Sequence, residues 1–81
     1  MGKHDKVREK ILSARSDQQI SFRDLVGLLK HLGFEERVKG SHHIFVRAGV
    51  AERINLQADG SNAKAYQVRQ VRQILCQYLD L

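Results

Sequence analysis

Three short runs of residues with extended character, separated by turns that contain glycine, constrain the fold of this chain more than any other feature. The runs cover residues 34–39, 42–47 and 50–57, and the connections at 39–41 and 48–49 each contain a glycine. Short runs bounded by tight turns typically pair as neighbouring antiparallel strands. The sequence therefore predicts a three-stranded antiparallel meander in the middle of the chain.

The alternation of side chains along these runs predicts which residues face a core, because successive side chains of a strand point to opposite faces of the sheet. We expect one apolar face and one polar, basic face. The apolar face is predicted to hold Phe34, Val38, Ile44, Val46, Ile54 and Leu56. The other face is predicted to hold Arg37, Lys39, Arg47, Arg53, Asn55 and Gln57.

Two helices are predicted, one before and one after the three strands in the sequence. Ser21 followed by Asp24 resembles a capping box, and leucines at helical spacing continue from there to Gly33, which suits the position just past a helix end. A turn cluster at 59–62 precedes a second long helix. Its apolar positions are Val68, Val71, Leu75 and Tyr78, with Cys76 expected as a small core residue.

A further helix with a thin apolar stripe is predicted at the start of the chain. Residues 3–15 are rich in helix formers, and Val7 and Ile11 stand four apart. Residues 16–19 indicate a polar connector. A helix, three strands and a helix give an α+β fold in which helices pack on one face of the sheet and leave the other face open.

The length of the chain and its net charge limit the functions that it can have. A chain of 81 residues forms one domain with a modest core. Its 14 Lys and Arg exceed its 9 Asp and Glu, and the net charge of +5 favours a polyanionic partner such as nucleic acid. Because a positive charge also keeps a small protein soluble, the placement of the basic residues has to decide between these interpretations.

The single cysteine and the shortness of the apolar runs indicate in which compartment of the cell the protein is expected. One cysteine cannot form an internal disulfide, which fits a reducing cytoplasm. No run approaches the roughly 18 apolar residues of a spanning helix, and the first residues lack the apolar stretch of a signal peptide. We expect a cytoplasmic protein with no membrane partner.

Two adjacent histidines, His42 and His43, follow a glycine turn and enter a strand beside basic residues. Strand alternation points their rings to opposite faces, so the two rings cannot easily share one metal ion. His4, His31 and Cys76 do not stand at ligand spacing to them. No phosphate loop or dinucleotide glycine pattern is present either. We therefore expect no metal site and no small-molecule cofactor.

A histidine beside basic residues can carry chemistry without a metal. An imidazole titrates near pH ~6.5, so it can take a proton from a ribose 2′-hydroxyl or give one to a leaving 5′-oxygen. The alternative is structural: His42 and His43 start a strand, one of them against the edge of the core and the other in solvent. The residues by themselves leave both interpretations open.

The start of the last predicted helix is a second candidate for contact with a polyanion. Residues 61–64 open this helix, where unpaired backbone N–H groups favour phosphate, and Arg69 and Arg72 follow. Ordinary capping and a solvated helix face explain the same residues equally well. Phe45 and Tyr66 could stack on bases, although core packing is the more common role of such rings.

Two segments resemble the HicA toxin family of small bacterial ribonucleases. They read DLVGLLKHLGF at 24–34 and KGSHHIF at 39–45, and the resemblance extends over about residues 20–79. It implies a fold like a double-stranded RNA-binding domain. The chain is then one HicA-like domain over 1–81, with an α-β-β-β-α core at 20–79 and an N-terminal helical extension at 1–19.

The resemblance also implies an activity and a partner. The family's catalytic histidine follows a Gly-Ser or Gly-Gly pair and maps onto His42, which implies metal-independent cleavage of messenger RNA. It further implies a HicB-type antitoxin that covers the active site. Whether His42 acts as base or acid stays open. Many family members carry a histidine at the end of the third strand, and this chain has none at 54–59.

RNA contacts are expected around this histidine. Gly40 and Ser41 are expected to shape the turn, and basic side chains are expected to hold phosphates. The predicted basic contacts are Arg37, Lys39, Arg47 and Lys64. Two alternatives stay open. The first is a protein that does not cleave RNA, either a non-catalytic module like a double-stranded RNA-binding domain or a decayed toxin. The second is a protein-interaction domain whose positive surface docks an acidic partner.

Overall fold

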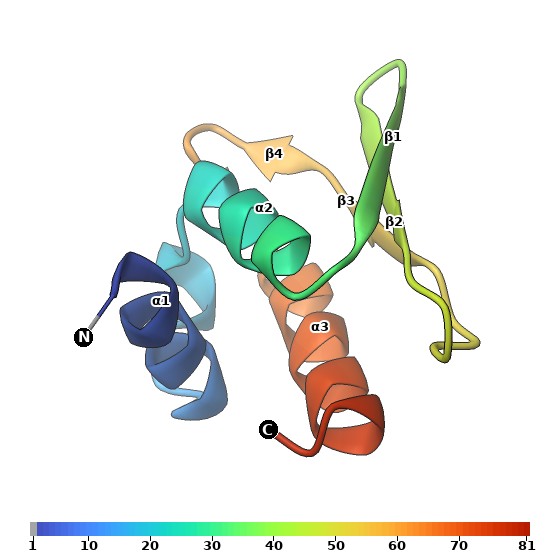
Figure 1. Cartoon of the computed structure of the whole chain (residues 1–81). Helices are drawn as coiled ribbons and strands as arrows, with labels where there is room; N and C mark the ends of the chain where they lie inside the picture. Colours follow the sequence, from blue (N-terminus) through green and yellow to red (C-terminus); the bar gives the residue numbers. More distant parts are fainter. Residues whose placement is uncertain (1) are drawn as a thin grey trace.

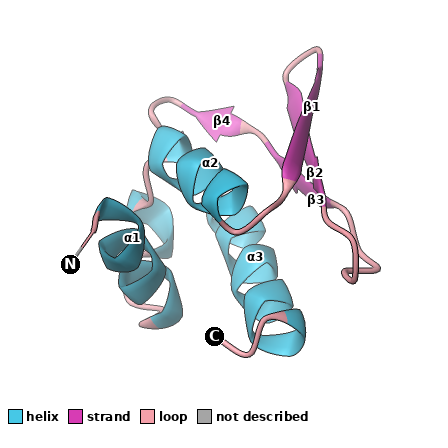
Figure 2. Ribbon diagram, in the orientation of Figure 1, coloured by secondary structure: helices cyan, strands magenta, loops and turns pink. Residues whose placement is uncertain are grey.

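A computed structural model describes residues 2–81, with the helices on one side of a three-stranded antiparallel sheet (Figures 1 and 2). The helices are α1 (Lys3–Leu12), α2 (Phe22–His31) and α3 (Ala65–Tyr78), with a short 3-10 turn η1 (Asp17–Gln19). The sheet has the order β1 (Glu35–Lys39), β2 (His42–Val46), β3 (Ile54–Leu56), and β4 (Ala58–Asp59) pairs with β5 (Asn62–Ala63) as a separate hairpin. The predicted α+β class and the antiparallel meander are confirmed.

Helix α2 begins and ends where local chemistry predicts. The Ser21 side chain accepts a hydrogen bond from the Asp24 backbone N–H at 3.3 Å, which satisfies one of the free donors of the first turn. At the other end Gly33 adopts a φ of +93°, a conformation that glycine takes without strain. The Phe34 N–H then bonds back to the Leu29 carbonyl at 3.0 Å, which closes the helix.

The side-chain alternation predicted for β2 is wrong by one residue. Phe45 is fully buried, whereas Ile44 and Val46 lie half-buried on the open face. The tight turn pairs Lys39 with His42, and this register sets Phe45 opposite Ile54 on the side of the helices. Because residues 44–46 are all apolar, their period alone does not identify the inward positions.

Val38 and the third strand also differ from the prediction. Val38 was expected in the core, but it is 59% exposed because the β1–β2 hairpin extends beyond α2 (Figure 1). The third strand begins at Ile54 rather than at residue 50, since the Val50 N–H closes a turn to the Arg47 carbonyl. The open face of the sheet carries Ile44 and Val46 besides its basic side chains.

The segment predicted to open the last helix is instead part of a small hairpin. Asn62 and Ala63 form β5, and α3 starts at Ala65 with Lys64 as its N-cap residue. The Ala63 N–H bonds to the Ile20 carbonyl at 2.9 Å, so this backbone group is not available to a phosphate. The predicted start of the last helix at residues 61–64 is therefore wrong, and Lys64 lies directly before α3 as its N-cap residue.

The N-terminal segment packs onto the rest of the chain. Val7 and Ile11 join the core, and Arg72 of α3 donates to the Ile11 carbonyl at 3.1 Å and to both carboxylate oxygens of Asp17 at 2.8 and 3.2 Å. This contact raises the pKa of Arg72, because the carboxylate stabilises the charged guanidinium. Arg72 is thus committed to a structural ion pair.

The core lies between the helices and the inner face of the sheet. It includes Ile20, Leu25, Leu28, Leu29, Phe34, Phe45, Ile54, Leu56, Ala63, Val68, Val71, Ile74 and Leu75 besides the two residues of α1. Cys76 was expected in this core, but it is exposed. It follows Leu75 by one position on α3, and a rotation of about 100° per residue turns it toward solvent.

Candidate functional site

His42 occupies the first position of β2, directly after the hairpin turn. Gly40 supports this turn with a φ of +61°, and Ser41 completes it. The His42 ring is exposed on the open face of the sheet, where its direct cross-strand neighbour is Lys39. A side chain that leaves a tight turn onto an open sheet face is accessible to a large ligand such as RNA.

Both ring nitrogens of His42 have an amide partner on the strand edge formed by β3. Nδ1 lies 3.2 Å from Asn55 Oδ1, and Nε2 lies 3.4 Å from Gln57 Nε2. These two contacts, one at each nitrogen, restrict the rotation of the ring, although the ring is exposed. The antiparallel pairing of β2 with β3 brings these groups together across 13 and 15 residues of sequence.

Gln57 is the most connected side chain of this cluster. Its amide nitrogen lies 3.5 Å from Ser41 Oγ, and its amide oxygen accepts a hydrogen bond from Lys64 Nζ at 3.3 Å. Its backbone N–H donates to Gln67 Oε1 at 2.8 Å. The cluster thus joins the hairpin turn, the end of β3 and the start of α3.

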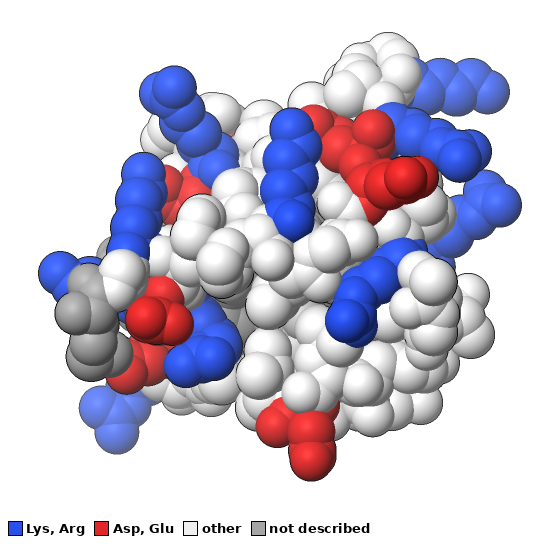
Figure 3. Space-filling view, in the orientation of Figure 1, with Lys and Arg blue, Asp and Glu red and all other residues white. Residues whose placement is uncertain are grey.

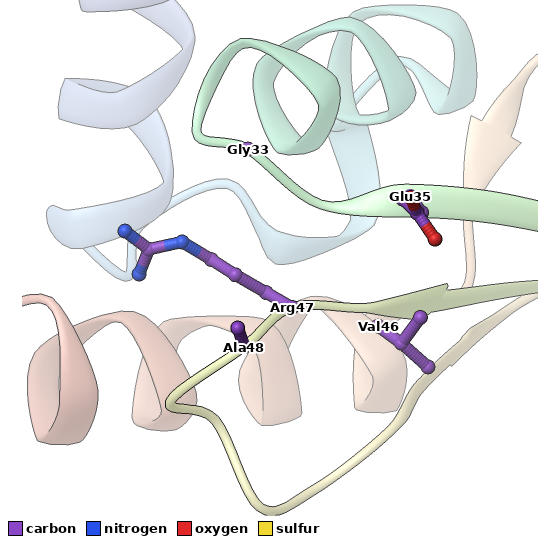
Figure 4. Close-up of a pocket in the computed structure, with 5 residues that line it drawn as sticks. All are labelled: Gly33, Glu35, Val46, Arg47 and Ala48. Atoms are coloured by element: carbon purple, nitrogen blue, oxygen red, sulfur yellow. The ribbon is translucent and has the colours of Figure 1, made fainter.

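The predicted phosphate contacts fall into two groups. Lys39 is paired with His42, Arg37 follows two residues away on the same face of β1, and Lys64 reaches the cluster through Gln57. Arg47 does not belong to this group, because it follows the opposite end of β2. Its side chain runs beside Gly33 at the end of α2, where both line a shallow pocket (Figure 4).

His43 points to the other side of the sheet and has a structural environment. Its Nδ1 lies 2.8 Å from Glu36 Oε2, and its ring meets the edge of Phe22 with centroids 4.9 Å apart. Glu36 also pairs with Lys30 at 3.0 Å. Hydrogen bonds from His43 and then from Lys30 lower the pKa of Glu36, because both stabilise the carboxylate. The two adjacent histidines therefore have different surroundings.

Sequence reasoning did not assign several residues of this cluster to a site. Asn55 and Gln57 were predicted on the polar face of the sheet, but they were not connected to His42. Alternation along β3 was the available signal, since it sets both side chains on the face where a residue after the turn emerges. Gln67 was not identified, because a buried glutamine on an apolar helix face has no local sequence signature.

Positive charge is distributed over the face of the molecule that Figure 3 shows. In Figure 3, Lys and Arg side chains project from several parts of the face shown, and Asp and Glu side chains lie among them. This face has no single uniform basic patch. The basic groups around His42 therefore have to be identified by their contacts.

Two further observations concern metals and membranes. Among residues 2–81, no three His, Cys, Asp or Glu side chains gather in a way that could hold a metal ion. Within the same residues, no helix has the length and the apolar character needed to span a membrane.

The comparison with protein families identifies the chain. A family model described as HicA toxin of bacterial toxin-antitoxin matches residues 22–77, which is more than half of the sequence. The chain belongs to the HicA toxin family. Membership makes it a toxin of a bacterial toxin–antitoxin system, and the family match spans α2, the sheet and nearly all of α3. No curated protein and no solved structure matches the chain significantly.

Helix α1 and η1 lie outside the segment matched by the HicA family model. They nevertheless complete the core through Val7 and Ile11. The α-β-β-β-α arrangement expected for a HicA toxin is present, and α1 and η1 are added to it on the helical side of the sheet (Figure 2).

Proposed function

We propose that this HicA-family toxin is a ribonuclease that cleaves messenger RNA, with His42 transferring the proton and without a metal ion. The observation that carries the proposal is the exposed His42 ring on the open sheet face, held by two amides, with Lys39 as its cross-strand neighbour and Lys64 bonded to one of the amides, Gln57. This arrangement suits a group that has to meet a substrate in one orientation.

The proposed reaction uses the 2′-hydroxyl of RNA as the nucleophile. His42 takes the hydroxyl proton while the 2′-oxygen forms a bond to phosphorus and the bond from phosphorus to the 5′-oxygen breaks. The leaving oxygen receives a proton from water, and the products carry a cyclic phosphate and a free 5′-hydroxyl. General base help of this kind contributes roughly 10²- to 10⁴-fold to the rate, so the enzyme is expected to be slow.

The basic residues near His42 supply the substrate contacts in this proposal. Lys39 and Arg37 on β1 and Lys64 before α3 hold phosphates on either side of the scissile bond. Gly40 and Ser41 let the RNA backbone approach the turn closely. Arg47 lies at the other end of β2 and would contact RNA only at a distance from the cleaved bond.

The proposed partner is a HicB-type antitoxin that covers the open face and hides His42. Both proteins would act in the cytoplasm, where messenger RNA is found. A positive surface with exposed Arg37 and Lys39 suits an acidic partner, because complementary charge steers association. Addition of the purified antitoxin is expected to stop cleavage in proportion to the complex formed.

The substitution His42→Ala tests the catalytic assignment. Labelled RNA is incubated with purified protein in the presence of a chelator, and the variant is expected to cut about 10²-fold or more slowly than the wild type. His31→Ala is the matched control, since it removes an exposed histidine outside the cluster. Induced expression of the same variants in bacteria should arrest growth for wild type and His31→Ala only.

Two outcomes would contradict this proposal. Cleavage by a folded His42→Ala variant at the wild-type rate would remove His42 from the mechanism. Salt-sensitive binding of RNA that stays intact with the wild type would instead support a binding module without catalysis.

A further inference from the structure

We propose that Gln57 is a positioning residue that fixes the neutral His42 ring in one tautomer, with its hydrogen on Nδ1 and its lone pair on Nε2. The inference rests on the proposed function, because it names the nitrogen that would act as the base in the same reaction. It is carried by a chain of contacts from Lys64 through Gln57 to His42 and Asn55.

Lys64 determines which way the Gln57 amide points. An ammonium group donates hydrogen bonds and accepts none, so the amide atom 3.3 Å from Lys64 Nζ is the oxygen. The amide nitrogen then faces Ser41 Oγ at 3.5 Å and His42 Nε2 at 3.4 Å. A reversed amide would set its NH₂ group against the ammonium, which is unfavourable.

The orientation of the amide determines the state of the ring. An amide NH₂ donates only, so His42 Nε2 has to accept, and a neutral imidazole that accepts at Nε2 carries its hydrogen on Nδ1. That hydrogen has an acceptor in Asn55 Oδ1 at 3.2 Å. The two amides therefore satisfy the same tautomer, one at each nitrogen.

The anchor of Gln57 lies inside the protein. Its backbone N–H donates to Gln67 Oε1 at 2.8 Å, and Gln67 is only 3% exposed. The other end of the Gln67 amide donates to the Tyr66 hydroxyl at 3.3 Å. A buried amide on α3 thus sets the position of Gln57, and through Gln57 the state of an exposed ring on the sheet.

This tautomer suits a general base. The Nε2 lone pair can take the 2′-hydroxyl proton as that oxygen bonds to phosphorus, and Asn55 Oδ1 then stabilises the imidazolium through Nδ1–H. The substrate hydroxyl replaces the Gln57 amide nitrogen at Nε2, and the amide keeps Ser41 as an acceptor. The other charged groups that face the ring are Lys39 across the hairpin and Lys64 behind Gln57.

The first test observes the ring directly and needs no activity. In protein labelled with nitrogen-15 in its histidines, the ring nitrogens of His42 are assigned by NMR at a pH where the ring is neutral. We expect the wild type to show hydrogen on Nδ1. In Gln57→Glu the carboxylate only accepts, so hydrogen is expected on Nε2. Hydrogen on Nε2 in the wild type would overturn the proposal.

The second test uses the pH dependence of cleavage. Gln57→Glu keeps a partner for Lys64 but places a negative charge beside His42, which favours the imidazolium and moves the acidic limb of the rate profile to higher pH. The rate near neutral pH is expected to fall at least tenfold, with KM little changed. Gln73→Glu, an exposed site on α3, makes the same charge change as a control.

The outcomes separate this proposal from the proposed function. A Gln57→Glu profile that coincides with that of the wild type would overturn the role of Gln57, even if His42→Ala is inactive. If His42→Ala cleaves RNA normally, the proposed function fails, while the NMR result still reports the tautomer. Melting temperatures of all variants show whether any loss of rate comes from unfolding.

Discussion

At the scale of single residues, two adjacent histidines have different surroundings because a strand alternates. His42 faces outward between two amides, and His43 faces the helices with Glu36 and Phe22. Glu36 is 16% exposed at its side chain and has two basic partners, His43 and Lys30. Protonation of Glu36 would therefore weaken both of these contacts on the inner side of the sheet.

Glu36→Gln is expected to lower the free energy of unfolding by about 1–2 kcal/mol near neutral pH, because the variant lacks the charge of the carboxylate that strengthens its hydrogen bonds with His43 and Lys30. The folded protein lowers the pKa of Glu36 below its ordinary value of 4.5. Its contribution is thus complete above that value and is lost as the pH falls through the lower folded pKa. Urea unfolding between pH 3 and 7 measures this difference.

The neighbouring carboxylate is the control for this prediction. Glu35→Gln removes the same charge from an exposed position on the outer side of β1. We expect it to change stability little at any pH, as is usual for exposed surface groups. Equal losses for both variants, or a gap that widens in acid, would contradict the role given to the Glu36 pair.

At the scale of secondary-structure elements, α1 is a helix that lies outside the family match. Its contact with the rest depends on the fully buried Ile11, with Val7 one turn earlier at 9% exposure. The Arg72–Asp17 pair then fixes the connector that follows. A helix with such a thin apolar stripe is marginal alone and gains its stability from this packing.

Ile11→Ala is expected to cost about 3 kcal/mol, since it removes a branched side chain from a fully buried site and leaves a cavity. Denaturant unfolding measures the loss, and Lys6→Ala on the exposed side of α1 is the control. Because the His42 cluster lies on the sheet, RNA cleavage by the folded variant is expected to stay close to the wild-type rate. A stability loss below about 1 kcal/mol would show that α1 does not dock as described.

At the scale of the whole molecule, the fold places some basic residues close to His42 and others far from it. The hairpin register sets Lys39 beside His42, whereas Arg47 ends up against Gly33 near the C-terminal end of α2. Net charge alone treats these residues as equal. Their different positions lead to different contributions to RNA binding.

Lys39→Ser is expected to weaken binding of a non-cleavable 2′-O-methyl RNA and to reduce the slope of log affinity against log salt by about 1. Arg47→Ser removes the same charge and is expected to change the slope by clearly less, because its side chain lies beside Gly33, away from His42. Binding titrations between 50 and 200 mM salt compare the two. Equal slopes for both variants would show that charge, not position, decides binding.

Local sequence rules determined the parts of this protein that depend on neighbours along the chain. Ser21 and Gly33 set the limits of α2, and Gly40 set the hairpin turn that His42 follows. The family resemblance and the open sheet face were likewise recognisable from the residues. Capping and turn geometry act over three or four residues, so they are legible without the fold.

The tertiary structure decided the parts that depend on distant residues. The inward position of Phe45 follows from strand register, and the exposure of Cys76 follows from the packing of α3. Gln57 meets His42 across 15 residues and is anchored by the buried Gln67. Such contacts form only when β3 pairs with β2 and α3 packs beneath them, because the pairing of strands and helices brings together side chains that the local sequence does not connect.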